Sequence, residues 1–276
     1  MRRKFKAINN GLIYFILSIG AVSMVVPFLW MVSTSLKEKK SINMYPPQWI
    51  PDPVVWANYP KAISVFPFFQ YLWNTFKITG LIVLGILLTS ALAGYAFARM
   101  RFRFRDAFFM VILAVMMIPG QVTMIPVFLL VHDFGWIDSH LALIIPSLVS
   151  PFGIFIMRQY FLTLPKDLED AAYIDGCAPP RIFALIMLPL ASPALAALTV
   201  LTFVGTWNSF MWPLLLISTK TKQMLAVGLL QFQNQYGGEY NLMMAATLLC
   251  LAPIMILYMF TQRYFIEGIA ISGIKG

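Results

Sequence analysis

The chain has 276 residues, of which 60% are hydrophobic and only 11% are charged. Its long apolar runs exclude a globular enzyme with a single anchor and indicate a polytopic membrane protein. The net charge of +9 does not indicate nucleic acid as a partner, because Lys and Arg gather in the cytoplasmic loops of membrane proteins.

Apolar segments of roughly 20 residues, enough for one membrane crossing, recur along the chain. They predict an all-α membrane protein, a single domain over 1–276, with six transmembrane helices near 11–32, 78–98, 107–131, 141–157, 190–217 and 242–261. The first run exceeds the hydrophobic region of a signal peptide and is interpreted as a retained span. None of the six segments contains Asp, Glu, Lys, Arg or His, which argues against coupling to protons.

Positive charge predicts the orientation of these spans. Every arginine falls in the hydrophilic segments on one side of the membrane. The basic residues on the other side, apart from histidine, are all lysines. The positive-inside rule therefore places the arginine side, with both termini, in the cytoplasm. External loops are then expected at 33–71, 132–140 and 218–241, the first of them non-helical because it is rich in proline.

Two charged segments have a structural interpretation. The alternation of arginine and aromatic residues over 99–105 lies beside a span, where a topology anchor is favoured over a nucleic-acid site. The loop 132–140 holds two His and two Asp, and a turn is favoured over a metal or enzyme site because no ligand geometry accompanies them. No metal site and no catalytic residues are assigned, so the chain is not expected to be an enzyme.

The longest cytoplasmic segment, 163–189, holds an acidic stretch. Three acidic residues around 167–170 suit the positive end of a helix dipole, and Gly176 suits a left-handed cap before Pro179 and Pro180. A short helix is therefore predicted. Helical spacing places four residues on one face as a small apolar knob with an acidic edge, namely Leu168, Ala171, Ala172 and Asp175.

The same stretch resembles a known motif. Asp170, Ala171 and Ala172, then Gly176, then the "LP" of 188–189 resemble the EAA loop of binding-protein-dependent ABC importer permeases, with Asp where Glu is usual. In that family the loop forms a coupling helix that docks on an ATPase subunit. The resemblance implies a coupling role for Glu169, Asp170, Ala171, Ala172 and Gly176.

The resemblance covers nearly the whole chain. "FARMRFRFRD", "RQYFLTLPKDLEDAAYIDG" and "GTWNSFMWPLL" are similar to the carbohydrate-uptake branch, specifically to its smaller, maltose-permease-type subunit. This implies a type I ABC importer permease fold with a cytoplasmic coupling helix. It also implies that Lys275 and Gly276 belong to a tail reaching the ATPases, and that the loop holding Gln233, Asn234, Gln235, Tyr236, Gly237 and Gly238 contacts a solute-binding protein.

The partners implied by the resemblance are a second permease, two ATPase subunits and an extracytoplasmic solute-binding protein, within a bacterial or archaeal cytoplasmic membrane. ATP and Mg would be bound by the ATPase and no cofactor by this chain, which lacks a phosphate loop. Trp207, Asn208 and Trp212 either line a sugar path or anchor a span at the interface. The alternatives are an ATPase-independent transporter or channel, and an importer of a non-sugar solute such as a glycerophosphodiester.

Overall fold

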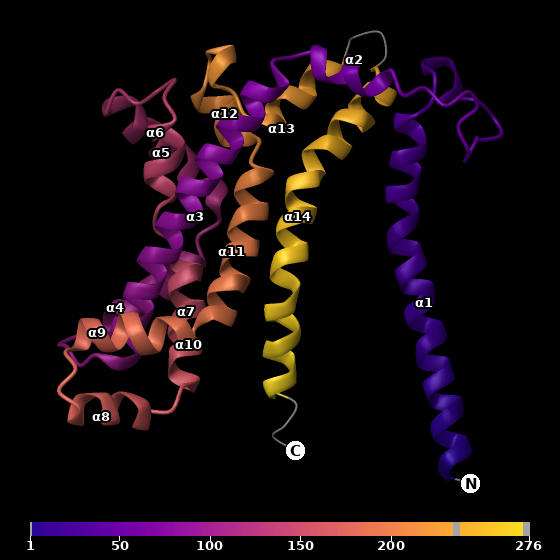
Figure 1. Cartoon of the computed structure of the whole chain (residues 1–276). Helices are drawn as coiled ribbons and strands as arrows, with labels where there is room; N and C mark the ends of the chain where they lie inside the picture. Colours follow the sequence, from indigo (N-terminus) through magenta and orange to yellow (C-terminus); the bar gives the residue numbers. More distant parts are fainter. Residues whose placement is uncertain (1, 234–237, 273–276) are drawn as a thin grey trace. The chain divides into compact units, whose positions relative to one another are not determined.

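The computed structural model describes residues 2–233 and 238–272, and within them every regular element is a helix (Figure 1). The chain forms two compact units, one made of Met1–Phe68 and Gly228–Ala252, the other of Phe69–Val227 and Pro253–Gly276. The long helix α14 (Tyr240–Ser272) contributes to both units. The two units are described separately below.

The first unit contains α1 (Arg2–Ser35), α2 (Asn58–Ser64), two 3-10 turns at Lys39–Ser41 and Leu229–Phe232, and the beginning of α14. Asn58 ties it together, because its side-chain amide donates to the carbonyls of Ser35 and Lys37. The most apolar stretch of α1 has no buried residue. An apolar helix surface of this size needs lipid or another protein to cover it.

The second unit contains the helices that position the candidate sites. They are α3 (Phe68–Arg99), α4 (Arg105–Met116), α5 (Gly120–Asp133), α6 (Leu141–Ile144), α7 (Pro151–Thr163), α8 (Asp167–Ile174), α9 (Pro179–Ile182), α10 (Leu188–Leu190), α11 (Ser192–Trp207), α12 (Met211–Leu216) and α13 (Leu225–Gly228). A π-helical segment, Phe183–Met187, joins α9 to α10. Within this unit α8 lies at one end, and α6 and α12, which pack on each other, lie at the other (Figure 1).

Four helical segments are long and apolar enough to cross a membrane, and up to six are found if each bent pair is one span. The four are Ile13–Ser35, Phe68–Arg99, Leu141–Thr163 and Tyr240–Gln262. The bent pairs are Arg105–Met116 with Gly120–Asp133, at 100°, and Pro179–Leu190 with Ser192–Trp207, at 72°. All six predicted spans therefore overlap an apolar helix or a bent pair of helices.

The structure differs from the predicted spans at its prolines. The span expected over 107–131 bends where Pro119 takes an extended conformation, since proline cannot donate to the preceding turn. The span expected over 190–217 is divided at 208–210 into α11 and α12. The loop expected to be non-helical over 33–71 holds α2 and the start of α3. Four of its six prolines lie before α2, and Pro60 and Pro67 fall in the first turn of α2 and just before α3, where proline is tolerated.

Close packing joins α3 to α7. A Cβ added at Gly94 would lie 2.6 Å from the Cβ of Met157 and 2.8 Å from the backbone nitrogen of Arg158. Only glycine permits this approach, which is typical of helix contacts within membranes. The α3 and α7 backbones are therefore held together about one turn before α3 ends.

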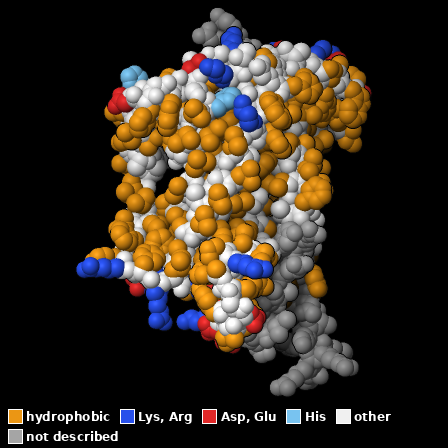
Figure 2. All heavy atoms as spheres, turned by 60° about the vertical axis from the view of Figure 1, so that its left-hand side comes forward, with side chains coloured by type: hydrophobic (Ala, Val, Ile, Leu, Met, Phe, Trp, Pro, Cys, Tyr) orange, Lys and Arg blue, Asp and Glu red, His pale blue; other side chains and the backbone are white. Residues whose placement is uncertain are grey.

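Charge is distributed unevenly over the second unit. Figure 2 shows hydrophobic side chains over the middle of the visible face, with Lys, Arg, Asp and Glu gathered toward its two ends. The apolar middle suits a hydrocarbon environment, and the charged ends suit water and lipid headgroups.

Candidate functional site

The acidic stretch forms the short helix that the sequence predicts. Helix α8 runs from Asp167 to Ile174 with three acidic residues in its first turn. Gly176 has φ +79°, and the amides of Gly176 and Cys177 donate to the carbonyls of Tyr173 and Ala172. This is a Schellman cap, which needs a left-handed residue at that position. The predicted helix and its glycine cap are confirmed.

The faces of α8 differ from the prediction in one respect. Ala172 does not share the outer face with Leu168 and Ala171, because it is buried in the core of the unit together with Ile182. Glu169, three residues earlier, is buried on the same inner face, while Asp170 is exposed. Of the two adjacent carboxylates, one therefore faces the protein and the other faces outward.

A buried arginine lies opposite the inner carboxylate. Nη1 of Arg99 is 3.6 Å from Oε2 of Glu169, and the two side chains are 4% and 10% exposed. Nη2 of Arg99 also donates to the carbonyl oxygens of Phe161, at 2.6 Å, and Leu164. In the sequence, Arg99 is one of several arginines that indicate the orientation of the spans in the membrane. Its place as the last residue of a long apolar helix is the one signal that distinguishes it from its neighbours.

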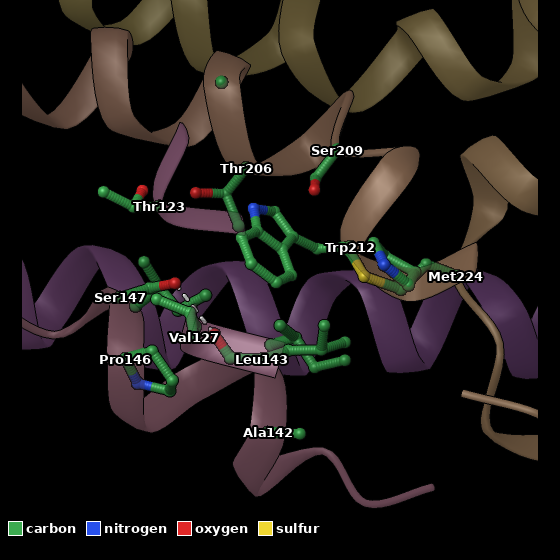
Figure 3. Close-up of a pocket in the computed structure, with 14 residues that line it drawn as sticks. Thr123, Val127, Ala142, Leu143, Pro146, Ser147, Thr206, Ser209, Trp212 and Met224 are labelled. Atoms are coloured by element: carbon green, nitrogen blue, oxygen red, sulfur yellow. Dashed lines mark hydrogen bonds between the residues drawn. The ribbon is translucent and has the colours of Figure 1, made fainter. Parts of the chain in front are cut away.

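A second candidate site is a cavity of about 330 Å³ in the same unit. Its wall comes from α3, α5, α6, α11 and α12, and Trp212 projects into it, so that Figure 3 shows the indole in the middle of the lining residues. Four hydroxyl side chains that sequence reasoning did not select line the cavity with it: Thr123, Ser147, Thr206 and Ser209.

The three residues proposed for a sugar path are separated by the structure. Trp207 is buried and stacks on Phe203, with ring centroids 5.1 Å apart. Asn208 is the exposed C-cap of α11 and does not line the cavity. Only Trp212 combines an aromatic face with neighbouring hydroxyls, the arrangement suited to a sugar ring.

The chemistry of this cavity is polar but uncharged. Thr123 and Ser147 donate to the carbonyls of Gly120 and Leu143, which leaves the lone pairs of their hydroxyl oxygens available to accept. Among the described residues that form the wall, no side chain is ionisable. Such a wall can hydrogen-bond a neutral solute and offers no counter-ion to an anion.

The loop 132–140 is tied to a second loop through Asp138. Its carboxylate accepts from the amides of Ser218 and Thr219, from the Thr219 hydroxyl at 2.6 Å and from Nζ of Lys222 at 3.0 Å. The Thr219 hydrogen bonds, followed by the one from Lys222, hold the pKa of Asp138 well below its usual range. Within the described chain no three His, Cys, Asp or Glu side chains gather as metal ligands.

The proposed binding-protein contact is described only at its ends. Gln233 is exposed, Gly238 is half-buried, and the amide of Glu239 donates to the carbonyl of Phe232 at 3.1 Å, so the two ends of the segment lie together. Asn234, Gln235, Tyr236 and Gly237 lie outside the described residues. The tail residues Lys275 and Gly276 also lie outside them.

Comparison with known proteins gives a consistent result. Residues 86–271 match the family model described as binding-protein-dependent transport system inner membrane component. The chain is 35% identical to the arabinooligosaccharides transport system permease protein AraQ of Halalkalibacterium halodurans, covering 100% of both chains. It is 32% identical to the sn-glycerol-3-phosphate transport system permease protein UgpE of Yersinia enterocolitica, over 93% of this chain and 94% of that one. A solved chain of a bacterial ABC transporter involved in the import of the acidic polysaccharide alginate matches with a TM-score of 0.82 at 25% identity, over 94% of this chain and 96% of that chain.

Proposed function

Because this chain belongs to the family of binding-protein-dependent transport system inner membrane components and is a permease of a sugar ABC importer, we propose that α8 docks on an ATPase subunit. The chain itself is a transport component and not the catalytic one. The observation that carries the proposal is the division of α8 into an anchored inner face and an exposed outer face with Asp170 and Ala171. An eight-residue helix is marginal alone, so its exposed face is suited to a partner that holds it.

The assembly we infer contains a second permease, two ATPase subunits that bind ATP and Mg, and an extracytoplasmic solute-binding protein. Six crossings with both termini in the cytoplasm, as the arginines predict, would put α8 on the ATPase side of a bacterial cytoplasmic membrane. The uncovered apolar surface of α1 supports contact with the second permease. An ATPase-independent transporter is not favoured, because the family is one of ABC importers.

For the substrate path we propose the cavity around Trp212. Its indole offers a flat apolar face to a sugar ring, and the hydroxyls of Thr206 and Ser209 line the same cavity, where they can hydrogen-bond ring hydroxyls. A glycerophosphodiester would enter this wall without a cation to pair its phosphate, which costs far more than burying a hydroxyl. The uncharged lining therefore favours a neutral saccharide over an anionic solute.

In the proposed cycle, ATP binding closes the ATPase subunits and displaces α8. The cavity then opens toward the solute-binding protein, which Gln233 and Gly238 would contact, and receives the sugar. ATP hydrolysis releases α8 and opens the path inward. This is alternating access, in which ATP binds one conformation of the importer better than the other and so shifts the population between them. The permease contributes the docking face on α8 and the substrate path.

The docking proposal is tested by Ala171→Glu in the tagged chain, co-expressed with its ATPase and purified in detergent. An unpaired carboxylate buried in an interface is costly, so ATPase recovery should fall by about tenfold or more. The matched control is Ala107→Glu, exposed in the first turn of α4, which should leave recovery unchanged. Equal recovery with both variants would refute docking through α8.

A further inference from the structure

We propose that Arg99 and Glu169 form the joint that passes movement of α8 into α3, which makes them positioning residues for transport. Given the docking of α8 proposed above, its two carboxylates would have separate tasks. Asp170 would face the ATPase, and Glu169 would act inside the permease. The motif that the acidic stretch resembles does not include Arg99, and it does not imply an ion pair between Arg99 and Glu169.

Three elements meet at the Arg99 guanidinium. Arg99 is the last residue of α3, and its Nη2 donates to the Phe161 carbonyl within α7 and to the Leu164 carbonyl just beyond it. Its Nη1 faces Glu169 in the first turn of α8. A guanidinium has donors in a fixed planar fork, so it can hold these acceptors at set angles, which a lysine cannot do. Displacement of α8 therefore acts directly on the end of α3.

The pair is buried but incompletely bonded. The 3.6 Å between Nη1 and Oε2 exceeds the roughly 2.7–2.9 Å of a charge-assisted hydrogen bond. Nε of Arg99 and Oε1 of Glu169 are also buried without a hydrogen bond of good geometry among the described residues, although the Tyr95 hydroxyl interacts with the same carboxylate. Such groups gain free energy if a small shift brings them closer. The observed arrangement thus leaves room for a second, tighter one.

Space for that shift lies beside the pair. A hollow of about 600 Å³ is lined by Arg99 and Glu169 together with Tyr95 and Tyr173, between the end of α3 and α8. Helix α8 is consequently not packed tightly against α3 along this side. The ion pair therefore bridges the two helices beside this hollow.

Helix α3 is suited to carry the movement onward. It is 32 residues long and contains no proline, whereas two other apolar segments of the unit are sharply bent. Ile78 and Ile82 of α3 line the Trp212 cavity. Ile82 lies 17 residues before Arg99, or about 25 Å along an α-helix. A continuous helix transmits a displacement over that length, whereas a bent pair of helices would absorb it at the bend.

The test uses the complete importer reconstituted in liposomes with its ATPases and binding protein. Glu169→Gln removes the charge with almost no change in volume, and Arg99→Lys keeps the charge but removes the fork. For each variant, the sugar moved per ATP hydrolysed should fall by about five- to tenfold, within the range usual for coupling between sites. Recovery of the ATPase on the tagged permease should stay at the wild-type level.

The controls separate coupling from docking and folding. Arg103→Lys, exposed near the same end of α3, should transport at the wild-type ratio. The double variant Arg99→Lys with Glu169→Gln should lose no more coupling than the worse single variant, because the effects of residues acting through one contact do not add.

Three results would overturn the proposal. One is an unchanged ratio of sugar to ATP in both single variants. Another is a loss of ATPase recovery in Glu169→Gln as large as in Ala171→Glu, which would make Glu169 a docking residue. The third is failure of both variants to accumulate in the membrane, which would make the pair a folding contact. Failure of the proposed docking is distinct, since Ala171→Glu would then recover as much ATPase as Ala107→Glu.

Discussion

Replacing Gly94 with alanine tests the close approach of α3 to the backbone of α7. Two effects oppose each other. Alanine stabilises a helix interior by about 0.8–1.0 kcal/mol relative to glycine. The added Cβ, however, would lie 2.6 Å and 2.8 Å from a Cβ and a backbone nitrogen of α7. Overpacking of this kind costs about 1–3 kcal/mol, and the upper end applies because a backbone atom cannot rotate away.

The overpacking cost therefore wins, and Gly94→Ala should destabilise the protein by about 1–2 kcal/mol. The matched control is Gly80→Ala in the same helix, where an added Cβ meets nothing within 4 Å. At about 2–4 °C per kcal/mol, thermal unfolding in detergent should be lowered by roughly 2–8 °C in Gly94→Ala and raised by roughly 2–4 °C in Gly80→Ala. If Gly94→Ala were as stable as Gly80→Ala, the close approach of α3 and α7 would be wrong.

The other predictions concern the two candidate sites and the Asp138 cluster. Trp212→Ala should raise the half-saturation concentration for sugar uptake about 2- to 12-fold through lost stacking, with Trp212→Phe in between, and Trp207→Phe should leave it unchanged. Gly176→Val should destabilise the end of α8 by about 1–2 kcal/mol, because φ +79° is strained for any residue with a Cβ. Faster proteolysis within 163–189 would reveal this, and cleavage at the wild-type rate would contradict it. Asp138→Asn should lower the thermal stability near neutral pH. Since the pKa of Asp138 is lowered on folding, its contribution is complete above the ordinary value of 3.8 and is lost as pH falls further. The stability difference between variant and wild type should therefore shrink steadily as pH falls below the ordinary value of 3.8. A difference as large at about pH 2 as at about pH 6 would refute the role of the carboxylate.

The features that the sequence predicts correctly depend on local chemistry. Gly176 and the acidic first turn define α8 because caps and dipoles act within a few residues. The bend between α4 and α5 was not predicted, because counting apolar residues locates a span without giving its direction. Likewise, no local pattern decides that Glu169 turns inward, since its partner Arg99 lies 70 residues earlier in the chain.

The two tryptophans illustrate the same limit within one short segment. Trp207 and Trp212 are only five residues apart in sequence, yet one is buried in a stack and the other faces the cavity. The difference arises because α11 ends at Trp207 and a separate helix, α12, starts at Met211. Sequence reasoning treated the segment as one continuous span and could not separate the two roles.

The uncharged wall around Trp212 has an electrical consequence. Moving one elementary charge across a membrane potential of 100 mV changes the free energy by about 2.3 kcal/mol, in either direction according to its sign. A neutral sugar passing a wall that carries no ionisable side chain in its described part moves no net charge through that field. Uptake would then proceed at the same rate in polarised and depolarised vesicles, driven only by the ATP supplied.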